Sequence, residues 1–234
     1  MTRRRWIADE VSGDHAALIG SHAEHLARVL RAQVGQEFDI AVENEVRRGR
    51  ITGIEPGRVE FELGKMIPVS PSPHITLALS IFKFDRMEWA IEKCTELGVA
   101  RIVPVIARRT EPHLARAAPK RVERWQRIAH QASEQSRRTS APEVSQPIKI
   151  NDALALPGSG RILLSESEKD VMLKDALQSL ASDVVLALGP EGGWTDDEQD
   201  QFREAGWVSA SLGDTILRAE TAAIAAVAIV LAAL

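Results

Sequence analysis

Residues 184–199, VVLALGPEGGWTDDEQ, join an apolar run, a glycine turn and the start of a helix. The apolar run is typical of a buried strand, and the helix opens on a capping box formed by Thr195 and Glu198. Turns of this kind often bind phosphate on helix N-terminal amides, and they then carry Lys or Arg. This turn carries Glu191 and the acids of 196–198 instead. It therefore predicts a ligand that is cationic, zwitterionic or rich in hydroxyls rather than a triphosphate.

Strands and helices alternate around this stretch, from His74 to the end of the chain. Apolar runs that predict strands stand at 75–81, 101–107, 161–165, 184–188 and 207–212. Helices are predicted between them. One opens on a capping box at Asp85–Glu88 and ends at Gly98, another has Pro119 in its first turn, and a third lies around Met172–Leu180. Such alternation predicts a parallel sheet covered by helices.

The first seventy residues have a different pattern. A capping box at Ser21–Glu24 predicts one short helix, and apolar alternation across residues 38–63 predicts short antiparallel strands. The proline-rich stretch IPVSPSPH, residues 67–74, should stay extended and marks a boundary. The sequence thus predicts a small β-rich domain at 1–70 and an α/β domain at 73–234.

Charge is distributed unevenly along the chain. The net charge of -4 by itself argues weakly against nucleic-acid binding. Between Arg101 and Ser140, however, ten basic residues stand against three acidic ones. Such a patch is typical of a protein that binds a phosphate backbone, although arginines on a solvated helix face give the same pattern.

The composition, 44% apolar and 26% charged, is typical of an ordinary globular protein. Cys94 is the only cysteine, so no internal disulfide can form, and no apolar signal segment follows Arg3–Arg5. The longest apolar stretch, Ala222–Leu234, is shorter than the roughly 20 residues that span a bilayer, and it predicts a buried C-terminal helix. We therefore expect a cytoplasmic protein without a membrane segment.

Two predicted strands close on a Leu-Gly pair, Leu188-Gly189 and Leu212-Gly213. Ligands of open parallel sheets gather at the carboxyl ends of the strands. Glycine there permits a sharp turn and close approach of a ligand, which suits recognition of a purine ring by backbone groups. Each pair alone could be only a tight strand-to-helix turn. Two pairs on successive strands favour a ligand site.

Other kinds of site are disfavoured. A dinucleotide fold needs G-x-G-x-x-G after its first strand, where this chain has Phe82–Asp85, and no P-loop lysine follows the glycines. His22 and His25 lie one helical turn apart without a Cys or carboxylate cluster beside them in the sequence, so we predict surface histidines and no metal. Cys94 is expected to be a packed thiol, and no G-x-S-x-G motif of a hydrolase occurs.

Several long motifs occur in an order that is typical of one family. They are HLARVLRAQVG (25–35), FDRMEWAIEKCTELGVARIVPV (84–105), ERWQRIAHQASEQSRR (123–138), LGPEGGWTDDE (188–198) and SLGDTILRAETAAIAA (211–226). Over nearly its whole length the chain resembles the RsmE family of ribosomal RNA methyltransferases, of the SPOUT class. The resemblance implies a PUA-like β-barrel at 1–70 before a SPOUT α/β domain with a deep C-terminal trefoil knot at 73–234. It also implies a homodimer that uses S-adenosyl-L-methionine to methylate N3 of a uridine in 16S rRNA of the small ribosomal subunit.

The same resemblance implies roles for individual residues. A cofactor with positive sulfur would tolerate the acidic turn, and its contacts are expected from Ser165, Leu188, Gly189, Gly192, Leu212, Gly213, Ile216 and Leu217. Arg138 and Arg218 are candidates to stabilise the uracil as N3 loses its proton. Glu191 is a third candidate, and it could bind the cofactor, orient the uracil or cap the following helix. RNA contacts are expected from Arg5, Arg108, Arg109, Arg121, Arg124 and Arg137.

Two stretches depart from the family pattern. Arg137 and Thr139 stand where the family usually has Gly and Asn. Gly213–Thr215 replaces a usual Gly-Pro-Arg, so that a cation is missing and an acid is present. Two alternatives therefore stay open: a SPOUT methyltransferase that acts on another RNA position, and a noncatalytic RNA-binding protein of the same fold.

Overall fold

The computed structural model describes residues 5–42, 45–68, 73–136, 138–178 and 183–234. Contacts divide the chain into two compact units, Met1–Pro71 with Ser133–Ala141, and Ser72–Ala132 with Pro142–Leu234. Each unit has its own sheet and its own buried core. Within the ranges described, no helix is long and apolar enough to cross a bilayer.

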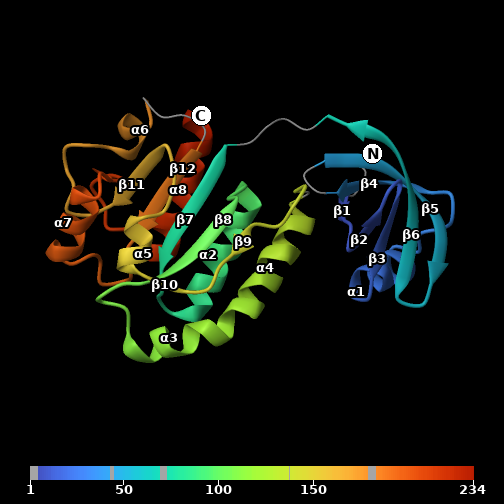
Figure 1. Cartoon of the computed structure of the whole chain (residues 1–234), viewed down its shortest axis with the longest axis horizontal. Helices are drawn as coiled ribbons and strands as arrows, with labels where there is room; N and C mark the ends of the chain where they lie inside the picture. Colours follow the sequence, from blue (N-terminus) through green and yellow to red (C-terminus); the bar gives the residue numbers. More distant parts are fainter. Residues whose placement is uncertain (1–4, 43–44, 69–72, 137, 179–182) are drawn as a thin grey trace. The chain divides into compact units, whose positions relative to one another are not determined.

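The second unit is built on a parallel sheet (Figure 1). Its strands are β7 (His74–Ser80), β8 (Arg101–Ile106), β9 (Glu143–Val144), β10 (Ile148–Lys149), β11 (Gly160–Leu164), β12 (Asp183–Leu188) and β13 (Val208–Ala210). They lie in the order β10-β8-β7-β12-β11-β13, with β9 paired to β8, and each of these pairings is parallel. The parallel sheet predicted from the alternation of strands and helices is therefore confirmed.

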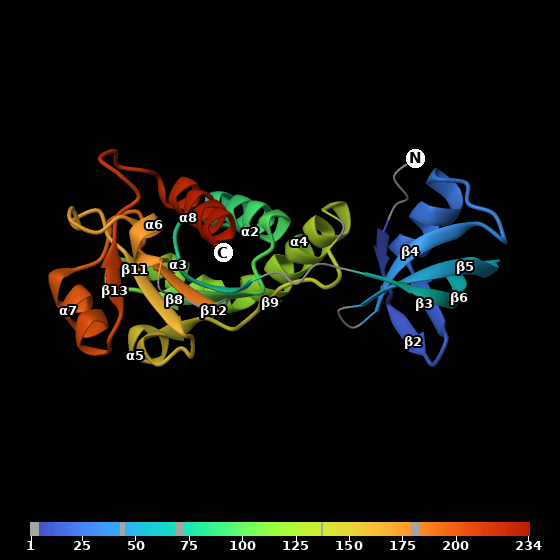
Figure 2. The same cartoon turned by 90° about the horizontal axis from the view of Figure 1, so that it is seen from above.

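Helices cover both faces of this sheet, as Figure 2 shows for α2 and α8 on one side and α5 on the other. The helices are α2 (Phe84–Leu97), α3 (Pro112–Ala117), α4 (Val122–Gln135), α5 (Ile150–Leu154), α6 (Leu173–Ala176), α7 (Asp196–Glu204) and α8 (Ala219–Ala233). Along β12, Val184, Leu186 and Leu188 pack in the core with α2 and α8, whereas Val185 and Ala187 pack with α5 and α7. Since both faces are covered, β12 is apolar throughout.

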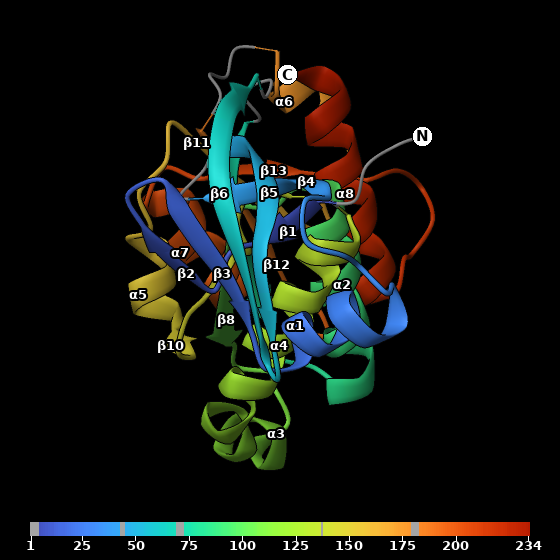
Figure 3. The same ribbon diagram turned by 90° about the vertical axis from the view of Figure 1, so that its right-hand side faces the viewer.

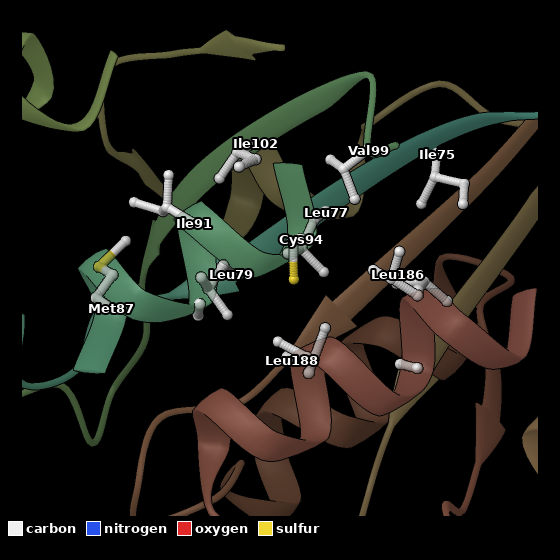
Figure 4. Packing of buried hydrophobic residues seen from close by; sticks show 14 of the residues in the cluster. Ile75, Leu77, Leu79, Met87, Ile91, Cys94, Val99, Ile102, Leu186 and Leu188 are labelled. Carbon is white, nitrogen blue, oxygen red and sulfur yellow. The ribbon is translucent and has the colours of Figure 1, made fainter. Parts of the chain in front are cut away.

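The core between the sheet, α2 and α8 consists of buried hydrophobic residues. In Figure 4, Leu77 and Leu79 of β7 lie with Met87, Ile91 and Cys94 of α2. Cys94 is completely buried, and burial raises the pKa of its thiol to about 12. It is the packed thiol that its apolar helix face predicted.

The first unit is a curled six-stranded sheet (Figure 3). Its strands are β1 (Arg5–Ile7), β2 (Glu10–Ser12), β3 (His15–Ile19), β4 (Glu37–Val42), β5 (Glu45–Glu55) and β6 (Arg58–Ile67). They lie in the order β1-β4-β5-β6-β3-β2, and the pairs are antiparallel except β1 with β4. Phe61, Leu18, Ile40 and Trp6 fill the core together with Leu26, which follows α1 (Ser21–Glu24).

The predicted surface position holds for His25, which is exposed, whereas His22 is half-buried. Its ring Nδ1 lies 3.0 Å from Oδ1 of Asp9, and its Nε2 lies 3.3 Å from Oε1 of Glu134. The hydrogen bond with Asp9 raises the pKa of His22. Carboxylates therefore do join this histidine, although they come from distant positions in the sequence.

Of three predicted capping boxes, only the one at Thr195 is formed. There Glu198 N donates to Thr195 Oγ1 at 3.3 Å, and Thr195 N donates to Glu198 Oε2 at 2.9 Å. The other two predictions are wrong, because α1 has Gly20 as its N-cap and α2 has Lys83, in each case without a side-chain cap.

Candidate active site at the strand ends

A cavity of about 750 Å³ lies at the carboxyl ends of β11, β12 and β13. Three loops form most of its lining, at Leu164–Ser167, at Leu188–Trp194 without Gly192, and at Ser211–Ala219. Parallel strands end at one edge of the sheet, so loops far apart in the sequence meet there. Of the eight predicted cofactor residues, all but Gly192 line this cavity.

The loop after β12 folds tightly back on itself. A side-chain carbon on Gly189 would lie 3.3 Å from both Gly193 C and Trp194 N, which leaves almost no room for a larger residue. Gly193 has a positive φ of 69°, and its amide donates to Pro190 O at 2.8 Å. Trp194 Nε1 donates to Leu164 O at 3.1 Å and so ties this loop to β11. The backbone of the turn is thus held against its neighbours.

The loop after β13 also depends on glycine. Gly213 has φ of 126°, a conformation that residues with a side chain rarely adopt, and its amide donates to Ser211 Oγ at 3.2 Å. Beyond it Ile216 is 84% exposed, although Leu217 beside it is half-buried. An exposed isoleucine on a cavity wall gives a ligand apolar surface to cover.

Hydroxyl groups from the loop after β11 converge on one amide. Ser165 Oγ and Ser167 Oγ each donate to Gln199 Oε1 at 2.9 Å. The two hydroxyl oxygens lie 2.8 Å apart, and Ser165 is buried. Gln199 also lines the cavity, so this cluster fixes a polar wall from α7 to β11.

Arg86 enters the cavity from the first turn of α2 and was not predicted. Its Nη1 donates to Glu191 Oε1 at 2.6 Å, and its Nε lies 3.9 Å from Glu220 Oε1. Glu220 is 2% exposed, and its Oε2 has no hydrogen-bond partner among the described residues. The position of Arg86 soon after a strand end is the sequence signal that could have identified it.

Arg108 and Arg109, predicted to contact RNA, are held by the region after β12. Arg109 Nη1 donates to the carbonyl oxygens of Gly192 at 2.6 Å and Trp194 at 3.1 Å. Arg108 N donates to Glu198 Oε1 at 2.7 Å, and its guanidinium pairs with Asp197 at 2.7 Å. Gly192 therefore takes part in the site by holding Arg109, even though it does not line the cavity.

The other predicted RNA residues make separate contacts. Arg121 lies over the ring of Phe84 at 4.8 Å from its centroid, and Arg124 makes a fork with Glu88 at 2.6 and 2.7 Å. Arg5 belongs to β1 in the first unit. Arg137 lies outside the described residues.

The three predicted catalytic residues have different surroundings. Glu191 lines the cavity and binds Arg86, and Arg218 lines it as the exposed N-cap of α8. Arg138 is not part of the lining and belongs to the segment that groups with the first unit. Burial lowers the pKa of its guanidinium to about 10.

The cavity as a whole is not acidic, although its central turn is. Four acidic residues and four basic ones line it, namely Glu166, Glu191, Asp196, Asp214, Lys83, Arg86, Arg109 and Arg218. The four basic residues lie outside residues 184–199, the stretch that suggested an acidic site, so that stretch alone did not predict them. The cavity therefore suits a ligand with charges of both signs.

The sheet and cavity define a class of protein. It is an α/β domain in which the backbone of three loops, at the ends of neighbouring parallel strands, lines a ligand cavity. A family model described as an RNA methyltransferase domain matches residues 70–231. That match covers most of the second unit and includes each cavity loop.

Whole-chain relatives identify the family more closely. The ribosomal RNA small subunit methyltransferase E of Synechocystis is 34% identical over 225 residues, which cover 90% of this chain and 71% of the relative. That of Rickettsia conorii is 32% identical and covers 94% and 87%. The crystal structure of the Neisseria gonorrhoeae protein of the same name, bound to S-adenosyl methionine, has a TM-score of 0.84 at 32% identity and covers 97% and 96%. The chain belongs to the ribosomal RNA small subunit methyltransferase E family and has the SPOUT α/β fold that its motifs predicted.

Proposed function

We propose that this protein uses S-adenosyl-L-methionine to methylate N3 of a uridine in 16S rRNA of the small ribosomal subunit. The observation that carries the proposal is similarity to the same family along almost the full chain, with the cavity at the strand ends intact. A Neisseria relative binds S-adenosyl methionine, and the names of the relatives specify small-subunit ribosomal RNA.

The residues of the cavity fit this cofactor. Gly189 and Gly213 bring bare backbone to the lining, which suits recognition of an adenine ring by amides and carbonyls. Leu188, Leu212, Ile216 and Leu217 add apolar surface, and Ser165 contributes to the polar wall. When bound, the cofactor supplies a methyl group on positively charged sulfur. The mixed charges of the lining can accommodate both this cation and the charged amino-acid end.

Groups of the chain must assist proton loss from N3 of the uracil. A cation or donor near a uracil oxygen stabilises the negative charge that develops there. Arg218 lines the cavity and could serve in this way, and Arg138 could do so or hold a phosphate. Glu191, by binding Arg86, orients a cation at the same wall.

RNA binding is proposed for the basic stretch and for residues 1–70 as a PUA-like domain. The target base must leave its stack to reach a cavity, which costs a few kcal/mol that contacts elsewhere have to offset. Arg5, Arg121, Arg124 and Arg137 are the proposed contacts, with Arg108 retaining an exposed guanidinium for this role. A deep trefoil knot around the cavity loops is part of the same proposal.

The protein is proposed to act as a homodimer in the cytoplasm, where ribosomes assemble. Helix α8 carries no charged residue from Thr221 to its end, yet Ala228 and Ala232 are exposed and Ile224 and Leu231 are only partly buried. These positions recur at helical spacing on one face, opposite a buried face. Exposed apolar stripes of this kind mark interaction surfaces.

Transfer of a methyl group from sulfonium needs no metal ion, and none is proposed.

The proposal is tested by mapping rRNA methylation in a strain that lacks the gene. The deletion should remove one 3-methyluridine from 16S rRNA, and the restored gene should return it. Persistence of that nucleotide, with no second copy of the gene present, would contradict the proposed substrate. Loss of a different methylated nucleotide would support the alternative of another RNA position. Absence of cofactor binding in calorimetry would instead favour a noncatalytic RNA-binding protein, for which Asp214 and Thr215 are the motivating departures.

A further inference from the structure

We propose that Arg86 is the fixed cation that contacts the reacting uracil and stabilises its developing negative charge. The inference rests on the proposed function and adds a catalytic residue to it. It places this role on the first turn of α2, rather than only on the basic motif around Arg138 or on the loop before α8.

Arg86 is held at the cavity by two carboxylates, one from a loop and one from a helix. Its Nη1 donates to Glu191 Oε1 at 2.6 Å, in the turn after β12. Its Nε lies 3.9 Å from Glu220 Oε1, in the first turn of α8. The side chain of Arg86 is 32% exposed, so one end is fixed while the cavity still reaches it. Preorganised donors of this kind are the ones that stabilise a transition state effectively.

Most hydrogen-bonding capacity of Arg86 is unused. A guanidinium has five N–H donors, and the described residues accept only one hydrogen bond from this one. The remaining donors are therefore available to a ligand in the cavity. A uracil carbonyl oxygen is an acceptor that such a donor can reach without displacing Glu191.

Glu220 gives the second reason for this assignment. It is 2% exposed, and its Oε2 has no partner among the described residues. A buried carboxylate is costly unless a cation or hydrogen bonds compensate for it. Arg86 is the cation that pairs with Glu220, so Glu220 acts as a positioning residue that holds the guanidinium at this wall.

The other cations of the lining are less suitable. Arg109 is committed to two backbone carbonyls, at Gly192 and Trp194. Lys83 and Arg218 are exposed, and such side chains lose more rotamer entropy when a ligand fixes them. Arg86 combines partial burial, a fixed position and unused donors.

Helix stability does not explain an arginine at this position. The first turn of a helix carries positive partial charge, so an acidic residue there is favourable and a basic one is not. Arg86 lies in the first turn of the 14-residue helix α2. Its presence there is consistent with a role in the cavity.

The chemical role is specific. As the proton of N3 passes to solvent, negative charge spreads onto the uracil oxygens, and an N–H of Arg86 donates to one of them. N3 then forms a bond to the methyl carbon, whose bond to sulfur breaks with the electron pair remaining on sulfur. Arg86 acts only as a hydrogen-bond donor and transfers no proton in this step.

The test is steady-state kinetics of Arg86→Ala on a 16S rRNA substrate, with cofactor affinity measured by calorimetry. We expect kcat to fall about 10²- to 10³-fold, as for removal of one transition-state donor. Cofactor Kd should change less than about twofold. The loss should diminish as pH rises, because hydroxide assists proton loss from N3, and added guanidinium ion should restore part of the rate. Arg86→Lys should retain more activity than Arg86→Ala.

Two control variants distinguish a catalytic defect of Arg86→Ala from a folding defect. Arg203→Ala removes an arginine that pairs with Asp200 on the exposed side of α7, and it should leave kcat unchanged. The double variant Arg86→Ala/Glu220→Gln removes the uncompensated buried charge and should remain as slow as Arg86→Ala. An unchanged kcat in Arg86→Ala would overturn the inference, as would a large loss of cofactor affinity without a change in kcat. Wild-type protein without any methylation of the substrate would instead contradict the proposed function.

Discussion

At the scale of single residues, substitution of Arg109 distinguishes two roles for this side chain, support of the turn after β12 and contact with RNA. Arg109→Ala removes the donor to the carbonyls of Gly192 and Trp194, and so frees the turn after β12. A hydrogen bond from a charged group contributes about 1.5–3 kcal/mol to stability. A loss of the lower value in binding free energy corresponds to an increase in Kd of about tenfold. We therefore expect about tenfold weaker cofactor binding, measured by calorimetry.

The neighbouring Arg108 is the control for this measurement. Its guanidinium pairs with Asp197 on the surface, where both side chains are mostly exposed, and such pairs contribute at most about 1 kcal/mol. Arg108→Ala should leave cofactor affinity within about twofold. If Arg109→Ala instead weakened only RNA binding, the RNA role predicted from the basic stretch would hold for it.

Single residues also show how far the sequence could predict the site. Leu188, Gly189, Leu212 and Gly213 were predicted because strand ends and glycines are visible in a linear pattern. Arg86 also follows a strand end, but that position alone does not assign its role. Its role depends on carboxylates more than a hundred positions away, at Glu191 and Glu220, and no local pattern encodes such a pairing.

At the scale of elements, the start of α7 supports a stability prediction. Thr195→Ala removes the hydroxyl that accepts from Glu198 N, which should cost about 1 kcal/mol of unfolding free energy. Thr195→Ser should recover most of it, because the hydroxyl is retained. Chemical denaturation measures both. Thr221→Ala, at an exposed position on α8, should stay within about 0.5 kcal/mol of wild type. Equal loss in both alanine variants would contradict the capping role.

The elements themselves were only partly predictable. Five of the seven strands of the parallel sheet were predicted as apolar runs from Ile75 onward. Strands β9 and β10 were missed, because two residues each give no pattern. Short helices were missed, among them α3 and α5, because four to six residues give too little periodicity. The capping pattern also gave a wrong prediction at Ser21, because Gly20, with a φ of 59°, is the N-cap of α1.

At the scale of the whole molecule, the apolar face of α8 predicts how copies of the chain associate. Ala228 is exposed and lies between the partly buried Ile224 and Leu231, with exposed Ala232 one turn further, in a helix whose last acidic residue is Glu220. Ala228→Arg would place a charge without a partner in any interface on this face. Burying an unpaired charge costs several kcal/mol. Light scattering should find dimers for the wild type and monomers for the variant at the same concentration. Glu204→Arg, at an exposed position at the end of α7, changes surface charge more strongly and should remain dimeric. Dimers that persist in Ala228→Arg would mean that α8 does not form the interface, and a monomeric wild type would refute the homodimer itself.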